Sequence, residues 1–108
     1  MGAALYSDPE PTRAEVDAIV EPLVIEFGAP WCGHCQGAQP LIGEAFASRP
    51  GLRHLRLEDG RGKRLGRSFQ VKLWPTLVFL KAGQEIARVV RPASVDQIRE
   101  ALDQIEQA

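Results

Sequence analysis

Cysteine and histidine are scarce in this sequence: a chain of 108 residues has two of each. Cys32 and Cys35 stand three positions apart, which excludes a framework of several disulfides. One disulfide of such short span would add little stability to a domain that is long enough to bury its own core. A structural zinc site normally has four ligands. His34 lies between the thiols and can hardly converge on one ion with them, so zinc held by these three and His54 is the weaker alternative.

The sequence also lacks a large excess of one charge, a long apolar run and a start that resembles a leader peptide. The net charge is −1, which argues against a general nucleic-acid binder, and 44% hydrophobic with 25% charged residues is typical of a globular domain. No apolar run approaches the roughly 18 residues that cross a bilayer, and residues 1–15 show no secretory signal. We therefore expect a cytoplasmic protein that binds neither nucleic acid nor membrane. In a reducing cytoplasm, a cysteine pair is more often catalytic or metal-binding than a permanent crosslink.

The charge is nevertheless distributed unevenly. Between Arg49 and Lys72 there are eight basic residues against Glu58 and Asp59, whereas the rest of the chain has five basic and twelve acidic residues. Such a cluster usually forms a solvated basic face. A docking patch for an acidic partner is the sharper alternative, and the sequence does not decide between them.

Hydrophobic patterning predicts one domain over residues 1–108, without repeats or low-complexity tracts. Thr12 and Glu15 form a capping box for a short first helix, and Pro40 should kink the helix that follows the cysteines. Residues 1–11 are expected to be a flexible N-terminal segment, with at most a short edge strand at 3–7. The later elements are expected to be a buried strand at 22–29, a helix at 32–48, a strand at 52–58, a short helix at 62–69, a hairpin at 75–90 turning at 82–84, and a last helix capped by Ser94.

This order describes an α/β fold with a mixed central sheet and helices on both faces. The cysteine pair then lies where a central strand ends and a helix begins. In sheets of this kind the carboxyl ends of the strands are where ligands bind and chemistry takes place.

The spacing of the two cysteines suits a redox couple. On the first turn of a helix, residues i and i+3 share a face, close enough to form a disulfide without moving the backbone. Cys32 is at the helix start, where free amide groups favour an anion, so the pKa of its thiol should be lowered. Cys35 should be more buried and keep its proton, as suits a resolving thiol. Gly33 leaves the approach to Cys32 open.

His34 is the informative residue between the thiols. As an imidazolium it would favour the Cys32 thiolate and hence the reduced form, which raises the reduction potential. The pair would then be more oxidising than one with proline at this position. The alternative is a solvent-facing histidine without effect.

Glu26 is an ionisable residue in an otherwise apolar strand. A buried lone carboxylate should have a raised pKa, and we expect Glu26 to take the proton of Cys35 through water when Cys35 attacks a mixed disulfide. The alternative is a glutamate on a strand edge that reaches solvent.

Pro75 follows Trp74 at the mouth of a strand, where a trans proline would be awkward, although most X–Pro bonds are trans. A cis Pro75 would leave the Trp74 backbone free to pair with an extended substrate segment beside Cys32. The sequence leaves both isomers open.

Taken together, these residues resemble the thioredoxin superfamily and, within it, the active site of protein disulfide isomerases. The stretch EFGAPWCGHC is similar to the isomerase pattern, with CGHC where thioredoxins have CGPC, and WPTLVFLKAG resembles the cis-proline strand. Pro40 falls at the kinking proline of the family, and the resemblance covers about residues 20–105. It implies a thioredoxin fold with a first strand that is short or absent.

The resemblance also implies roles for individual residues. Cys32 would be the nucleophile, Cys35 the resolving thiol and Glu26 the buried carboxylate, with Arg56 placed to tune it. The residues expected around the substrate are Trp31, Gly33, Trp74, Pro75 and Thr76. No cofactor is needed beyond the redox-active pair. The implied partners are protein disulfides and a reductant resembling thioredoxin reductase, or glutathione, and the protein should be a monomer.

Some residues depart from the family pattern. Gly28 replaces a bulky aromatic residue and Gln36 a frequent lysine, while Leu73 and the Arg91-Pro92 pair stand where thioredoxins tend to have glycines in the substrate groove. We therefore expect a different groove. The function predicted is a thiol–disulfide oxidoreductase that reduces or isomerises protein disulfides. The alternative is a redox-sensing binding module that contacts its partner through residues 49–72.

Overall fold

A computed structural model describes residues 6–107 of the chain. Along the chain, the elements are α1 (Arg13–Asp17), β1 (Leu23–Gly28), α2 (Gly33–Ala47), β2 (Arg53–Glu58), α3 (Arg64–Ser68), β3 (Thr76–Lys81), β4 (Gln84–Val90) and α4 (Val95–Gln107). This is the order predicted from the sequence, with Gln84 in the return strand rather than in the turn. Helix α2 continues through Pro40.

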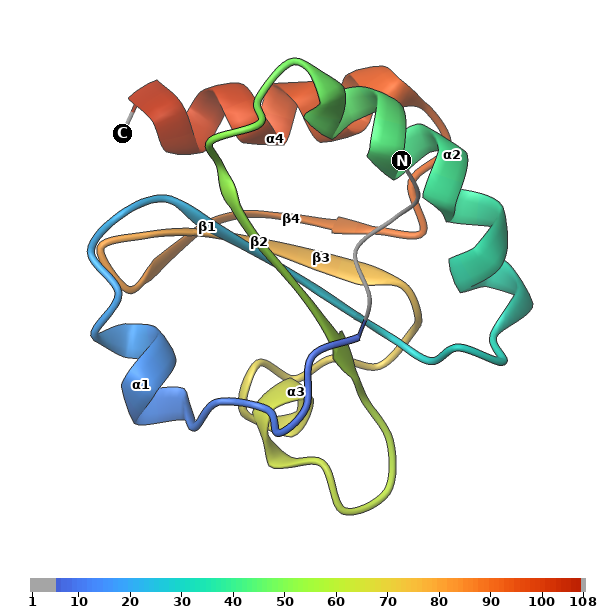
Figure 1. Ribbon diagram of the computed structural model, residues 1–108, viewed down its shortest axis with the longest axis vertical. Coiled ribbons are helices and arrows are strands. Elements are labelled where there is room, and N and C mark those ends of the chain that lie inside the picture. Colours follow the sequence, from blue (N-terminus) through green and yellow to red (C-terminus); the bar gives the residue numbers. More distant parts are fainter. Residues whose placement is uncertain (1–5, 108) are drawn as a thin grey trace.

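The strands form one mixed sheet in the order β2-β1-β3-β4. Strand β1 is parallel to β2 and antiparallel to β3, and β4 returns antiparallel to β3. Helices α2 and α4 lie on one face of the sheet and α1 and α3 on the other (Figure 1). The predicted fold class is therefore confirmed, and β1, which leads to the cysteines, lies inside the sheet.

Two local predictions explain where the helices begin. The Thr12 hydroxyl accepts from the Glu15 amide at 3.1 Å while the Thr12 amide donates to the Glu15 carboxylate at 2.8 Å, so the capping box is confirmed. Ser94 accepts from the Gln97 amide at 3.3 Å at the start of α4. Both caps satisfy amide groups that have no partner inside the helix.

Strand alternation produces a separate core on each face of the sheet. In β1, Val24 packs with α2 and α4, whereas Leu23, Ile25 and Phe27 pack on the side of α1 and α3. All the side chains of β1 are buried, as the continuous apolar run predicts. The same alternation turns Glu26 toward α2.

The segment before α1 lies against β2. Ser7 forms an isolated parallel bridge with Leu57, and its amide donates to the Arg56 carbonyl at 2.8 Å. Residues 3–5 of the expected edge strand lie outside the described residues, so this single bridge is what the structure shows of a first strand. Within residues 6–107, every helix is too short or too polar to cross a membrane.

Candidate active site

Cys32 is the N-cap of α2 and lies four residues after the end of β1. Its extended backbone lets the sulfur turn back onto the helix, where Cys32 Sγ accepts from the Cys35 amide at 3.3 Å. A sulfur in this position faces the positive end of the helix dipole. The side chain is 8% exposed, so the sulfur is enclosed but still within reach of another molecule.

The surroundings of Cys32 favour its thiolate. Burial raises the pKa of the Cys32 thiol, but hydrogen bonds from Cys35 and from the His34 backbone outweigh this effect. The positive charge of Arg91 acts in the same direction, so the pKa is lowered overall, as the sequence predicted. The resemblance placed Arg91 in the substrate groove, but no effect of Arg91 on Cys32 was predicted. The effect of the His34 imidazole stays a prediction.

Cys35 has the opposite properties. Its side chain is completely buried, and burial raises the pKa of its thiol to about 11, helped by the Cys32 sulfur and the negative charge of Glu26. Both cysteines are free thiols in this structure. The couple therefore combines an ionisable outer sulfur with a protonated inner one.

Matching periods in β1 and α2 bring the site together. Two residues along a strand and four along a helix both advance by about 6 Å. Glu26 therefore lies opposite Gln39, and Gly28 lies opposite Cys35. The structure shows this pairing: Gln39 Nε2 donates to Glu26 Oε2 at 2.7 Å and to the Cys35 carbonyl at 3.2 Å. Gln39 thus connects the carboxylate to the turn that carries the resolving thiol.

Glu26 is fully buried, which excludes a glutamate reaching solvent from a strand edge. It is not a lone carboxylate, however, and that expectation was wrong. Besides Gln39, His54 Nε2 lies 3.2 Å from Glu26 Oε1 and Arg56 Nε donates to Oε2 at 3.2 Å. In the parallel pair β1–β2 these side chains come from the same face, so strand register supplies the partners. The contact of Arg56 with the carboxylate is confirmed.

His54 also stacks on Phe46, with ring centroids 4.3 Å apart. It is therefore part of the carboxylate cluster rather than of a ligand set around the cysteines. Among the residues that the structure describes, no three histidine, cysteine, aspartate or glutamate side chains gather as a metal site requires.

Tyr6 is a site residue that the sequence analysis missed. Its ring lies against the Arg56 guanidinium, 4.2 Å from the ring centroid, and its hydroxyl is buried without a hydrogen-bond partner among the described residues. Burial raises the pKa of Tyr6 to about 12, with a smaller contribution from Cys35. The hydroxyl comes within 3.4 Å of where a side chain at Gly28 would begin. The missing aromatic at position 28 was the signal that another residue had to fill this space.

Gly28→Ala tests how tightly this space is packed. The added methyl group would lie 2.6 Å from Cys35 Sγ, so either the strand or the buried thiol has to move. We expect a loss of about 1–3 kcal/mol in the free energy of unfolding, measured by urea denaturation, together with slower resolution of mixed disulfides. Gly43→Ala is the matched control, because its added carbon meets nothing within 4 Å on an exposed helix position. Equal stability of both variants would contradict the packing.

The residues expected to surround the substrate are Trp31 and Gly33, which adjoin Cys32 in the chain, and Trp74, Pro75 and Thr76 at the start of β3. The Trp74–Pro75 peptide bond is cis, which settles the question that the sequence left open. Trp74 packs against the cysteine turn, and Trp31, 71% exposed, meets it edge-on with ring centroids 5.5 Å apart. Around Gly33 there is open space within 4 Å of an added side-chain carbon. The two tryptophans and the open side of Gly33 thus flank the turn that carries Cys32.

Two details of this region differ from expectation. The Trp74 carbonyl is not free, because Arg91 Nε donates to it at 2.9 Å. Thr76 is buried, and its hydroxyl donates to the Leu73 carbonyl at 2.6 Å. Thr76 therefore fixes the loop before the cis proline from inside rather than offering a side chain to the substrate.

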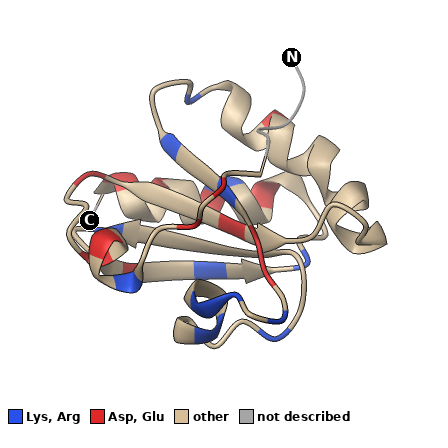
Figure 2. Ribbon diagram, turned by 60° about the horizontal axis from the view of Figure 1, so that its bottom comes forward, with Lys and Arg blue, Asp and Glu red and all other residues tan. Residues whose placement is uncertain are grey.

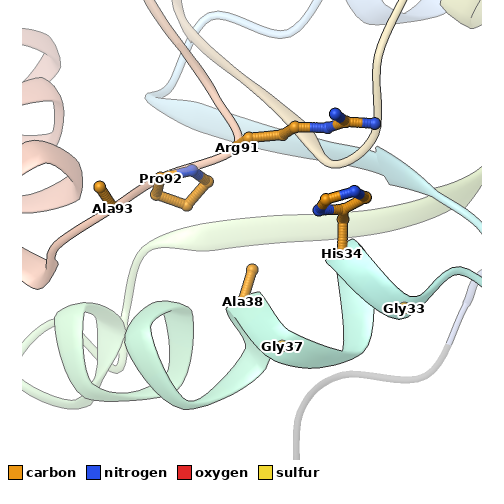
Figure 3. A pocket seen from close by; sticks show the side chains of 7 residues that line it. All are labelled: Gly33, His34, Gly37, Ala38, Arg91, Pro92 and Ala93. Carbon is orange, nitrogen blue, oxygen red and sulfur yellow. The ribbon is translucent and has the colours of Figure 1, made fainter.

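A groove of about 650 Å³ runs between the first turns of α2 and the loop after β4. Figure 3 shows the His34 and Arg91 side chains facing each other across it. The remaining lining residues are small or apolar: Gly33, Gly37, Ala38, Pro92 and Ala93. The groove is open to solvent and begins at the residue that follows Cys32.

The basic cluster at 49–72 divides into two parts. Arg49, Arg53 and Arg56 form ion pairs with carboxylates elsewhere in the fold. The others gather on α3 and its flanking loops (Figure 2) and form no ion pair with any described residue; they are Arg61, Lys63, Arg64, Arg67 and Lys72. Only this second part is a free basic surface.

The chain is similar to known thioredoxins in both sequence and fold. Residues 7–104 match the family model described as Thioredoxin. Thioredoxin 2 from Pseudomonas aeruginosa in its reduced form superposes with a TM-score of 0.84 at 54% identity, over 95% of this chain and 96% of that one. Thioredoxin from Mycobacterium bovis is 34% identical over 71 residues, which are 65% of this chain and 61% of that protein. The bifunctional thioredoxin reductase/thioredoxin of Mycobacterium leprae is 32% identical over 78 residues, 71% of this chain but 17% of that protein.

Proposed function

Because the chain belongs to the thioredoxin family and is a thiol–disulfide oxidoreductase, we propose that Cys32 and Cys35 reduce or isomerise protein disulfides. The Cys32 thiolate attacks one sulfur of the substrate disulfide, forms a mixed disulfide and expels the other substrate sulfur as a thiolate. Cys35 then loses its proton and attacks Cys32 Sγ. The substrate leaves with both sulfurs reduced, and its two electrons come from the Cys32 and Cys35 sulfurs, which are oxidised to a disulfide.

The single observation that carries this assignment is the different placement of the two sulfurs: Cys32 Sγ caps α2 and accepts from the Cys35 amide at 3.3 Å, whereas Cys35 is completely buried. Cys32 has a lowered pKa and Cys35 a pKa raised to about 11. Since the thiolate is the attacking species, the outer sulfur reacts first and the inner one waits for the loss of its proton. Glu26 is the proposed acceptor of that proton through water, supported by its burial beside the Cys35 turn.

The substrate is proposed to lie along Trp31, Gly33 and the cis Trp74–Pro75 bond, whose position beside Cys32 supports this role. The reductant is proposed to resemble thioredoxin reductase. The name of the Mycobacterium leprae relative, which joins a thioredoxin reductase to a thioredoxin, supports that choice over glutathione. We further propose a monomer in the cytoplasm that acts as one domain. The chemistry needs no group beyond the two cysteines.

The reduction potential tests whether the site is of the isomerase type. We expect the Cys32/Cys35 couple to lie well above thioredoxin's value of about −270 mV and toward the isomerase value of about −180 mV, because interactions that stabilise the Cys32 thiolate favour the reduced form. The measurement is equilibration against glutathione buffers. His34→Pro should lower the potential.

A potential at or below about −270 mV would contradict the isomerase-type assignment and leave a reductase. Turnover separates the enzyme from the redox-sensing alternative. An enzyme reduces a disulfide-bonded test protein many times over when a reductant is supplied, whereas a sensor is oxidised and reduced once and turns over poorly. We expect many turnovers.

A further inference from the structure

Arg91 is held in one position at the edge of the groove beside Cys32. Its backbone is left-handed, with φ of 50°, a conformation that side-chain-bearing residues rarely adopt. Its amide donates to the Pro75 carbonyl at 3.0 Å and its Nε to the Trp74 carbonyl at 2.9 Å. Two hydrogen bonds from one residue thus anchor the guanidinium on the cis-proline loop.

This anchoring uses only one of the three guanidinium nitrogens. Neither Nη group forms a hydrogen bond or ion pair with any residue between 6 and 107, and the side chain extends over the groove toward His34 (Figure 3). The groove lining contains no acidic residue, and two of its residues are glycines on α2. The groove thus offers fixed cationic donors beside space for a peptide backbone.

We propose that this groove binds a carboxylate side chain on the substrate segment that flanks the disulfide, and that Arg91 makes the enzyme prefer acidic segments. The inference rests on the proposed function. A guanidinium holds a carboxylate through parallel N–H donors, and less conformational freedom is lost when its position is already fixed. Arg91 is therefore a specificity residue here, at a position where a glycine would leave the groove without charge.

The occupied Trp74 carbonyl supports the same conclusion. A substrate segment that paired with this carbonyl would have to displace Arg91 Nε. A segment with a carboxylate can instead meet the free Nη groups and leave that hydrogen bond intact. The charge of Arg91 also acts on Cys32, so the groove and the reacting sulfur belong to one site.

The test uses disulfide-linked peptides that differ in one residue. A glutamate, glutamine or lysine is scanned along the positions that flank the cysteine on each side, and kcat/KM is measured at low salt. We expect glutamate to exceed glutamine by about five- to tenfold at the best position, the size of one partly exposed charge-assisted hydrogen bond. Lysine should be slower still, and added salt should reduce the preference.

Arg91→Gln should bring the glutamate-to-glutamine ratio close to one, whereas Arg91→Lys, which retains charge without the planar fork, should keep part of it. The ratio is decisive because any change in the Cys32 thiolate affects both peptides equally. Arg53→Gln is the control: Arg53 pairs with Leu23 at the opposite end of β1 and should leave the ratio unchanged.

Equal rates for glutamate and glutamine at every position, or a preference that persists in Arg91→Gln, would overturn the inference. Failure to turn over any peptide, the neutral ones included, would contradict the proposed function and this inference with it. Turnover of neutral peptides without a charge preference would contradict the inference alone.

Discussion

Cys32→Ser is expected to abolish reduction of a disulfide-bonded test protein, while Cys35→Ser is expected to accumulate the mixed disulfide. The difference follows from the ionisation of the two thiols: the Cys32 sulfur has a lowered pKa, and the buried Cys35 thiol has a pKa raised to about 11. Without Cys32 there is no thiolate within reach of the substrate. Without Cys35 the first attack still takes place, but nothing releases the product.

The two variants are distinguished by mass spectrometry under non-reducing conditions after incubation with a peptide disulfide. Cys35→Ser should carry one peptide on Cys32, and Cys32→Ser should carry none. Alkylation of the wild type at neutral pH should label Cys32 first, by a factor of at least about a hundred, because the fractions of thiolate differ by more than that. Labelling of Cys35 first, or a stable adduct on Cys32→Ser, would contradict the assignment of the nucleophile.

Much of this site follows from local sequence. The apolar run between two prolines defines β1, and the cysteine that caps the next helix has its sulfur on free amides, so the lowered pKa of Cys32 could be predicted. The burial of Glu26 follows from the same run. Each of these predictions depends on residues close together in the chain, where spacing alone fixes which side chains share a face.

The rest depends on contacts between distant segments. Arg56 and His54 reach Glu26 because of the register of a parallel strand pair, which the pattern of one strand does not contain. Tyr6 enters from a segment expected to be flexible. Arg91 reaches the Trp74 carbonyl only because the chain turns sharply after β4 in a left-handed conformation. Arg91 and Gly28 depart from the family pattern, and both lie at the site: Arg91 at the rim of the groove and Gly28 against the buried thiol of Cys35.

Glu26→Gln is expected to slow the resolution of mixed disulfides by about a hundredfold at pH 7, the usual contribution of a positioned general base. Burial raises the pKa of the Cys35 thiol and keeps it protonated at neutral pH, so without a base its attack should accelerate about tenfold per pH unit until the thiol ionises. The wild type should depend less steeply on pH. The two rates should therefore converge as the pH rises.

The sign of the effect separates two roles for Glu26. Its negative charge contributes to the raised pKa of Cys35, so a glutamate that acted through charge alone would hinder the thiolate, and Glu26→Gln would speed resolution. A proton acceptor gives the opposite result. The measurement is stopped-flow release of a fluorescent peptide from the mixed disulfide across pH, with Glu21→Gln, an exposed carboxylate that pairs with Arg53, as the control. The glutamine side chain keeps one oxygen that can accept from Gln39 and Arg56, so a slower rate in the folded variant reports the loss of the proton acceptor.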